Sequence, residues 1–164
     1  MKSHYSFLLA EDDENDVFFL QRAFQQAKIE NPLRVVRDGQ EAIDYLSGDG
    51  KFSDRNLYPL PHLIILDLKM PRKTGLDVLR WLQEQPELRC LPVLVLSSSA
   101  QRTDIERAYE LGANGFVVKP ASLEKRVELA KLIGTFWLDF NVGPLVCTEG
   151  LESARKLREE RGAL

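Results

Sequence analysis

The sequence predicts an α/β fold in which five helices sandwich a five-stranded parallel sheet. Short apolar runs alternate along the chain with segments whose apolar residues recur every three or four positions, which is the order of repeated strand–helix units. Two of the runs, 63–66 and 93–96, are continuously apolar, as expected of strands that are covered on both faces of a parallel sheet. Such a sheet places ligands beyond the carboxyl ends of its strands.

The first half of the chain supplies two strands and two helices. The first strand is predicted at 7–10, an apolar run that ends at four consecutive acidic residues. A helix over 16–29 follows, because its apolar residues are spaced by three and four. The second strand is predicted at 33–36, and a short helix over 40–46 ends before Gly48.

The alternation continues after a long connection. The segment 48–62 has no clear period and contains two prolines, so we expect a loop insertion there. The third strand is the apolar run 63–66. Pro86 and Gly112 end the next two helices. The remaining elements are predicted in the order helix, strand, helix, strand and long helix, at 76–85, 93–96, 103–111, 115–118 and 122–140.

Length and composition limit the classes of function. The 164 residues are about one domain's worth, and the formal net charge of −3 gives no basic footprint, so we expect no direct binding of nucleic acid. No apolar run approaches the roughly 20 residues that span a bilayer, and the amino-terminal run is too short for a signal peptide. The sequence thus predicts a soluble, cytoplasmic protein whose two cysteines, Cys90 and Cys147, are free thiols.

Chemically useful side chains follow four of the five predicted strands. Because the carboxyl ends of parallel strands lie at one edge of a sheet, we expect these side chains to converge there. They are Glu11, Asp12 and Asp13 after the first strand, Asp67 after the third, Ser97 after the fourth and Lys119 after the fifth.

This set of residue types suits phosphoryl transfer with a divalent cation. Crowded carboxylates repel each other unless a cation is present, and oxygen-only ligands favour Mg²⁺ or Mn²⁺ over zinc. Lys119 and the Ser97 hydroxyl can each donate to a phosphate oxygen. Asp67 is then the natural nucleophile, and its product is a carboxyl–phosphoryl anhydride.

The sequence resembles the receiver domains of two-component response regulators, which have a flavodoxin-like fold. The resemblance covers roughly residues 5 to 140, and five motifs in order carry it: Leu8-Leu9-Ala10-Glu11-Asp12, Leu66-Asp67-Leu68-Lys69-Met70-Pro71, Gly75, Leu96-Ser97-Ser98-Ser99 and Val118-Lys119-Pro120. It implies a histidine kinase as phosphoryl donor and Asp67 as phosphoacceptor. It also implies a signalling protein rather than a metabolic enzyme.

The resemblance assigns further roles. Glu11 and Asp12 would hold the metal together with Asp67 and the backbone carbonyl of Lys69. Ser97 and Lys119 would contact the phosphoryl group. The register of the acidic pair has one alternative: Asp13 would replace Asp12 as the direct ligand if the first strand ran one residue longer.

Two features near the lysine are also implied by the resemblance. Phe116, three residues before Lys119, occupies the aromatic switch position and would swing inward as Ser97 moves towards the phosphoryl group. A plain core aromatic is the other interpretation of Phe116. The peptide bond between Lys119 and Pro120 matches one that is cis in this family.

A narrower resemblance is to the stand-alone regulators that serve bacterial and cyanobacterial phytochromes. The insertion before the third strand, the Asp16-Val17 pair and the aromatic ending 135–140 carry it. It implies a receiver domain over 1–141, a helical extension over 142–164 with no effector domain, and a phytochrome-type sensor kinase as partner. Members of that family are often dimeric. The chain ends its last helix with Phe136, Trp137 and Phe140, more aromatic surface than one helix end buries alone. We therefore expect a homodimer through the fourth helix, fifth strand and fifth helix, with packing of these aromatics against the extension as the alternative.

The sequence therefore predicts a single-domain response regulator that accepts a phosphoryl group from a histidine kinase onto Asp67 in a Mg²⁺-dependent reaction and switches a protein–protein surface. One alternative is a receiver-like dimer or scaffold that works without phosphorylation. Another is an aspartyl phosphatase of the haloacid dehalogenase type. Such phosphatases carry a second aspartate two residues after the nucleophile, where this chain has Lys69, and this argues against the phosphatase.

Overall fold

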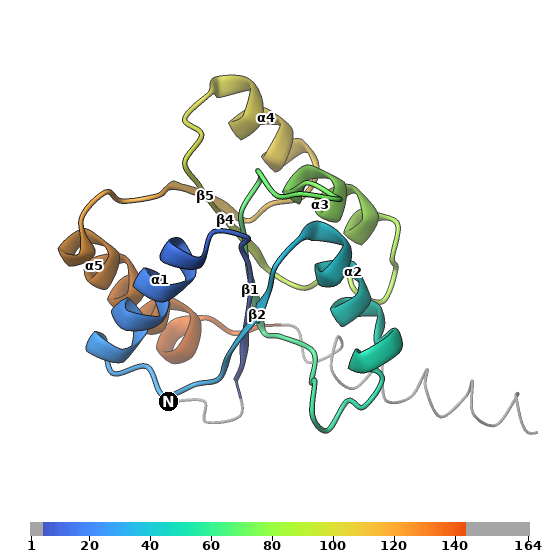
Figure 1. Cartoon of the computed structure of the whole chain (residues 1–164), viewed down its shortest axis with the longest axis horizontal. Helices are drawn as coiled ribbons and strands as arrows, with labels where there is room; N and C mark the ends of the chain where they lie inside the picture. The colour runs from blue at the N-terminus through green and yellow to red at the C-terminus, as the bar shows by residue number, and fades with distance from the viewer. Residues whose placement is uncertain (1–4, 144–164) are drawn as a thin grey trace, which may run out of the picture.

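Five parallel strands form one sheet in the computed structural model, which describes residues 5–143 (Figure 1). The sheet order is β2-β1-β3-β4-β5, and every neighbouring pair is parallel. The predicted fold class is confirmed, and all five predicted strands form. They are β1 (Phe7–Ala10), β2 (Leu33–Val36), β3 (Leu63–Leu66), β4 (Val93–Ser97) and β5 (Gly115–Val118).

Helices cover both faces of the sheet. In Figure 1, α1 and α5 lie on one side of the strands, and α2 and α3 lie on the other. The bounds are α1 (Glu14–Gln26), α2 (Gly39–Ser47), α3 (Gly75–Gln83), α4 (Arg102–Glu110) and α5 (Leu123–Ile133). Each predicted helix is present, with ends that differ by one to several residues. Helix α1 begins two residues earlier than expected, because the Asp13 side chain accepts hydrogen bonds from the amides of Asn15 and Asp16 and so caps it.

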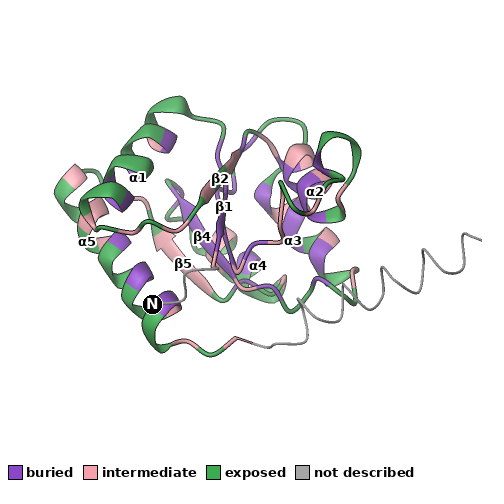
Figure 2. Cartoon of the chain, turned by 90° about the horizontal axis from the view of Figure 1, so that it is seen from below, coloured by how far each residue is buried: buried purple, intermediate pink, exposed green. Residues whose placement is uncertain are grey.

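Two apolar layers pack against the sheet, one on each face. Alternate residues of β1 show the division: Leu8 and Ala10 join the layer beneath α2 and α3, and Phe7 and Leu9 join the layer beneath α1 and α5. In Figure 2 the helices turn exposed residues outward and buried residues towards the strands. Strand β1 is buried throughout, whereas the edge strand β5 is only partly covered. The central strands therefore give fixed positions for the residues at their carboxyl ends.

The long last helix differs from its prediction. The segment expected as one helix over 122–140 divides into α5 and the π-helical segment η2 (Gly134–Phe140). The helix type changes at Gly134, which lies close to Ile29 after α1. A Cβ added at Gly134 would be 3.0 Å from the Ile29 side chain. Of the terminal aromatics, Phe136 and Phe140 are exposed, but Trp137 packs against the core layer under α1 and α5.

The insertion before β3 adds aromatic residues to the core layer under α2 and α3. It contains the 3-10 turn η1 (Gly50–Phe52), and Phe52 is buried. The Phe52 ring lies 5.1 Å from the ring of Tyr45 on α2 and 5.1 Å from that of Tyr58. The expectation of a plain loop over 48–62 is therefore wrong in part, because aromatic residues anchor the segment to the end of α2.

Two further expectations concern the cysteines and the carboxyl terminus. Cys90 is disulfide-bonded, so the expectation of a free thiol there is wrong; the spacing of cysteines in the sequence does not show which segments meet in the fold. Cys147 and residues 144–164 of the expected extension lie outside the described residues. Within 5–143, the helices are too short or too polar to cross a bilayer.

Candidate functional site

Backbone hydrogen bonds fix the residues that follow the strands. The amide of Glu11 donates to the carbonyl of Val36 at 3.0 Å, and the amide of Asp67 donates to the carbonyl of Ala10 at 3.0 Å. The amide of Lys119 donates to the carbonyl of Ser97 at 2.8 Å. The sheet pairing thus continues one residue beyond the strands. The backbones of Glu11, Asp67 and Lys119 are therefore held by the sheet, and their side chains lie at the same edge of it.

Three carboxylates meet at this edge. One oxygen from each of Glu11, Asp12 and Asp67 lies within 4.8 Å of the others. Glu11 and Asp67 are buried, and Asp12 is exposed. A donor set of carboxylate oxygens with one side open to solvent fits a hard divalent cation such as Mg²⁺ or Mn²⁺, which keeps some of its water ligands. The predicted convergence of these three side chains is confirmed.

Asp13 caps the start of helix α1. Its Oδ1 accepts hydrogen bonds from the amides of Asn15 at 2.8 Å and Asp16 at 3.0 Å, at the start of α1. Strand β1 ends at Ala10, and the sheet pairing beyond it reaches only the amide of Glu11. The geometry therefore favours Glu11 and Asp12 as the acidic pair and leaves Asp13 as a helix cap.

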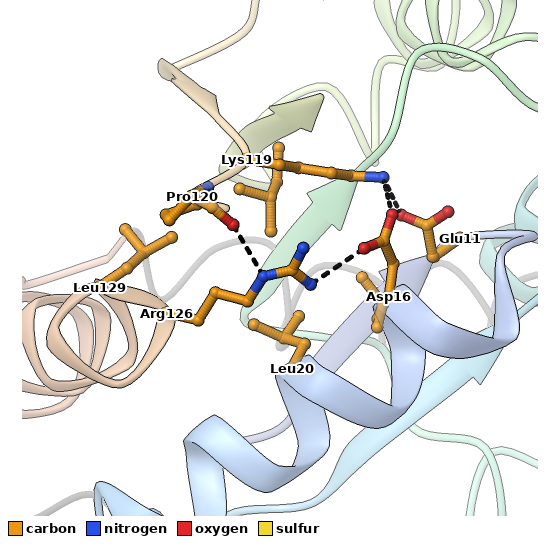
Figure 3. Close-up of a pocket in the computed structure, with 9 residues that line it drawn as sticks. Glu11, Asp16, Leu20, Lys119, Pro120, Arg126 and Leu129 are labelled. Carbon is orange, nitrogen blue, oxygen red and sulfur yellow. Dashed lines mark hydrogen bonds and ion pairs between the residues drawn. The ribbon is translucent and has the colours of Figure 1, made fainter. Parts of the chain in front are cut away.

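Lys119 lies among the acids, and its side chain is only 9% exposed (Figure 3). Its Nζ is 2.6 Å from Glu11 Oε2, 2.8 Å from Asp16 Oδ2 and 3.0 Å from Asp67 Oδ2. Burial alone would lower the pKa of this ammonium, but its hydrogen bonds to Asp16 and Glu11 and the charge of Asp67 raise the pKa above its ordinary value. Lys119 therefore stays protonated at neutral pH.

The pKa of the Glu11 carboxyl is raised by its surroundings. Burial of the carboxyl raises its pKa to about 7, and the nearby charge of Asp67 adds to the rise, although the Lys119 ammonium opposes both. This carboxyl therefore binds a proton more readily than an ordinary glutamate does. A cation bound beside it would favour the ionised form.

Asp16 and Arg126 also lie at the site, and the pattern of strand ends does not predict either of them. Arg126 of α5 donates through Nη1 to Asp16 Oδ1 at 2.9 Å and through Nε to the carbonyl of Pro120 at 2.8 Å. Burial alone would raise the pKa of Asp16, but hydrogen bonds from Lys119 and Arg126 hold it below its usual value. The helical spacing indicates an inward position for Asp16, because it lies one turn before the buried Leu20 on the same face of α1.

Ser97 lies on the same edge and is fully buried. Its Oγ accepts a hydrogen bond from the amide of Ser99 at 3.3 Å. The buried Ser99 in turn donates through its own hydroxyl to Asp104 Oδ2 in the first turn of α4 at 2.5 Å. A chain of two hydrogen bonds therefore connects the residue at the end of β4 with helix α4.

The remaining predicted site residues flank this edge. Lys69 is exposed, and its amide lies 3.4 Å from Asp67 Oδ1. Phe116 is half-buried on β5 and packs against the core layer under α2 and α3; its role as a switch stays a prediction.

The peptide bonds of residues 5–143 contain no cis bond. Lys119–Pro120 is therefore trans, the isomer that X–Pro bonds prefer by about 0.5–1 kcal/mol, and the implied cis bond is not found.

Comparison with known proteins gives a consistent family assignment. The family model described as "Response regulator receiver domain" matches residues 7–131. Among curated proteins, the chain is 33% identical over 132 residues to "Response regulator Rcp1" of Synechocystis sp., covering 80% of this chain and 88% of that protein.

Solved structures of the same family are similar in fold. The phosphorylated cyanobacterial phytochrome response regulator RcpA is 35% identical, with a TM-score of 0.79 over 86% of this chain and 99% of that one. The Mn²⁺-bound form of Rcp1 is 32% identical, with a TM-score of 0.76 over 85% and 99%. The bacteriophytochrome response regulator RtBRR is 36% identical, with a TM-score of 0.69 over 98% and 94%. The resemblance to regulators of bacterial and cyanobacterial phytochromes is confirmed.

Proposed function

This chain belongs to the response regulator receiver domain family of two-component signalling, and from that premise we propose that it accepts a phosphoryl group from a histidine kinase onto Asp67. The observation that carries the proposal is the contact of Lys119 Nζ with Asp67 Oδ2 at 3.0 Å, beside the carboxylate cluster of Glu11, Asp12 and Asp67. We place the receiver domain at 1–141 and an extension at 142–164.

The transfer is a displacement at phosphorus. An Asp67 carboxylate oxygen attacks the phosphorus atom of a phosphohistidine, an O–P bond forms, and the P–N bond breaks. The imidazole nitrogen of the kinase leaves with the electron pair of that bond and can take up a proton. The product is an acyl phosphate on Asp67. Such a step needs positioning and charge neutralisation more than covalent chemistry from the protein.

Each surrounding side chain has one part in this step. Lys119 donates to a phosphoryl oxygen and offsets its charge. The Ser97 hydroxyl donates to a second phosphoryl oxygen once it turns from the Ser99 amide. Glu11, Asp12, Asp67 and the carbonyl of Lys69 would hold a divalent cation, Mg²⁺ or Mn²⁺, which would neutralise further charge on the phosphoryl group. The Mn²⁺-bound form of Rcp1 supports the choice of metal.

The kinase partner and the output follow from the same relatives. We propose a phytochrome-type sensor kinase, because RcpA and RtBRR are named as phytochrome response regulators. The acyl phosphate biases a two-state equilibrium, in which Phe116 and the hydrogen bonds from Ser97 through Ser99 to α4 change the outer surface. The protein acts in the cytoplasm and binds proteins rather than nucleic acid.

A second copy of the chain is the proposed occupant of that surface. Apolar side chains are exposed on all three elements involved: Tyr109 on α4 is 49% exposed, Val118 on β5 is 46% exposed and Leu132 on α5 is 63% exposed. Strand β5 also forms an edge of the sheet, with backbone groups that no neighbouring strand of the described sheet covers.

The test of phosphoacceptance uses acetyl phosphate as a small donor. The protein is incubated with it, with and without Mg²⁺, and weighed intact by mass spectrometry beside the Asp67→Asn variant. We expect a gain of one phosphoryl group that requires Mg²⁺ and is absent from the variant. Equal masses with and without the donor, for both proteins and with Mg²⁺ present, would favour the phosphorylation-independent scaffold instead.

A further inference from the structure

Asp16 differs from the other two carboxylates that hold Lys119. Glu11 and Asp67 both belong to the proposed metal cluster, and Asp67 is also the proposed phosphoacceptor. Asp16 lies outside that cluster, yet its Oδ2 is only 2.8 Å from Lys119 Nζ. An ammonium has three donors, and one of the three here is given to a carboxylate with no part in the proposed chemistry.

Arg126 holds this carboxylate in place. Its guanidinium binds Asp16 through Nη1 and the carbonyl of Pro120 through Nε, at 2.9 Å and 2.8 Å. Pro120 is the residue directly after Lys119. Figure 3 shows the resulting chain of contacts, which runs from α5 through Arg126 to Asp16 on α1 and on to the lysine. The planar fork of arginine suits such a double contact, and it connects two helices with the loop that carries Lys119.

The arrangement has a physical benefit for Lys119. A lysine side chain has many rotamers, so holding it in one place costs entropy. A buried cation is also expensive unless it is paired. When a phosphoryl group is attached to Asp67, the surroundings of that carboxylate change, whereas the contact with Asp16 can persist. A carboxylate outside the reaction therefore keeps the ammonium at the point where negative charge develops.

We propose that Asp16, fixed by Arg126, is a positioning residue that holds the Lys119 ammonium for contact with a phosphoryl group on Asp67. Arg126 acts through Asp16 and does not touch the reacting atoms. This inference rests on the proposed function, and it assigns these two residues a role that the carboxylate cluster alone does not explain. Asp16 remains ionised in this role, since Lys119 and Arg126 both lower its pKa.

The first experiment measures binding of beryllofluoride, an acyl-phosphate mimic, in the presence of Mg²⁺. We compare the unaltered protein with Asp16→Asn, and use Glu14→Gln as the matched control, because Glu14 is an exposed acid in the same first turn of α1. Asp16→Asn should weaken binding about tenfold, the size expected for loss of one charged hydrogen bond. Glu14→Gln removes the same charge and should leave the affinity unchanged.

A second readout separates positioning from a general structural role. In the beryllofluoride-bound protein, the Lys119 ammonium should give a slowly exchanging ¹⁵N-detected signal that Asp16→Asn loses. Arg126→Met should also weaken binding. In the Asp16→Asn background, however, Arg126→Met should have little additional effect, because residues that act through one contact are not additive. Urea unfolding of each variant establishes that the fold is retained.

The possible results are distinct. Unchanged or tighter binding of beryllofluoride to Asp16→Asn, with the Lys119 signal kept, would overturn the proposal while phosphorylation of Asp67 stood. Full additivity of the Asp16 and Arg126 substitutions would also overturn the coupling between them. If the unaltered protein took up neither acetyl phosphate label nor beryllofluoride, the proposed function itself would fail, and the role of Asp16 would fail with it.

Discussion

The chemistry of this protein is concentrated in one buried lysine and the acids around it. Lys119 contacts Glu11, Asp16 and Asp67 with distances of 2.6 to 3.0 Å. Burial raises the cost of every charge in this group, and the lysine offsets part of that cost for its partners. The lysine does not offset the whole cost at Glu11, because burial still raises the pKa of this carboxyl to about 7.

This raised pKa makes stability depend on pH. Between the ordinary value of 4.5 and about 7, the folded chain binds more protons at Glu11 than the unfolded chain does. The contribution to stability is therefore complete below about pH 4.5 and is lost as the pH rises towards 7. Glu11→Gln should reduce this pH-dependent loss by about 1–3 kcal/mol, since one pKa unit corresponds to about 1.4 kcal/mol.

Urea unfolding at a series of pH values from 4.5 to 8 checks this prediction. Glu14→Gln is the control, because it removes an exposed acid from the neighbouring helix turn. Parallel stability curves for the unaltered protein and Glu11→Gln would show that Glu11 does not titrate in this range.

At the scale of elements, the strands fix the site and the helices complete it. The pairing of β1 with β3 and of β4 with β5 extends one residue past the strands, which aligns Asp67 and Lys119. Helix α1 adds Asp16, and α5 adds Arg126. The insertion before β3 contributes no residue to the described site, and its aromatic residues pack against α2 instead.

The insertion should therefore contribute to stability. Phe52→Ala should lower the free energy of unfolding by about 3 kcal/mol, because it leaves a cavity between Tyr45 and Tyr58. Leu57→Ala, in the same segment but 60% exposed, should have no measurable effect. Denaturant unfolding measures both. Equal stability of the two variants would mean that the aromatic cluster does not hold this segment in solution.

Element type was more predictable than element ends. Strands such as 63–66 are predictable because burial on both faces leaves only apolar residues in the run. The early start of α1 was missed because its cap, Asp13, is one of several adjacent acids, and the sequence does not show which of them accepts the helix amides. The η1 turn was missed because Phe52 packs against residues six or more positions away.

At the scale of the molecule, helices cover the two faces of the sheet, whereas each outer strand, β2 or β5, pairs with only one neighbour in the described sheet. Strand β5 is an outer strand, and exposed apolar side chains lie on it and on α4 and α5. Exposed apolar groups gathered around an open edge are typical of an interface. This supports the proposed dimer, in which the face that responds to phosphorylation is also the face that binds a second copy.

A charge on this face should separate the copies. Tyr109→Glu should convert the dimer to a monomer, because it buries an unpaired carboxylate in the interface. Leu57→Glu, which is exposed in the segment before β3, should leave the dimer intact. Size-exclusion chromatography with light scattering gives the mass of each. A monomeric unaltered protein, with and without beryllofluoride, would contradict the dimer.

The sequence predicted the strand-end residues of the site but not the helix-borne ones. Residues such as Asp67 and Lys119 follow strands, and parallel strands end at a common edge, so their meeting follows from topology. The contact of Asp16 with Arg126 joins residues 110 positions apart on two helices. Its existence depends on how α1 and α5 pack against each other, which the periodicity of either helix alone does not determine.

The most direct test of the central claim locates the phosphoryl group. The protein is treated with acetyl phosphate and Mg²⁺ and then with borohydride, which reduces an acyl phosphate of aspartate to homoserine. Peptide mass spectrometry then reads the modified position. We predict homoserine at position 67, with Asp12 and Asp16 unmodified. Homoserine at another acid, or at none while the intact mass shows a phosphoryl group, would contradict the assignment of Asp67 as the phosphoacceptor.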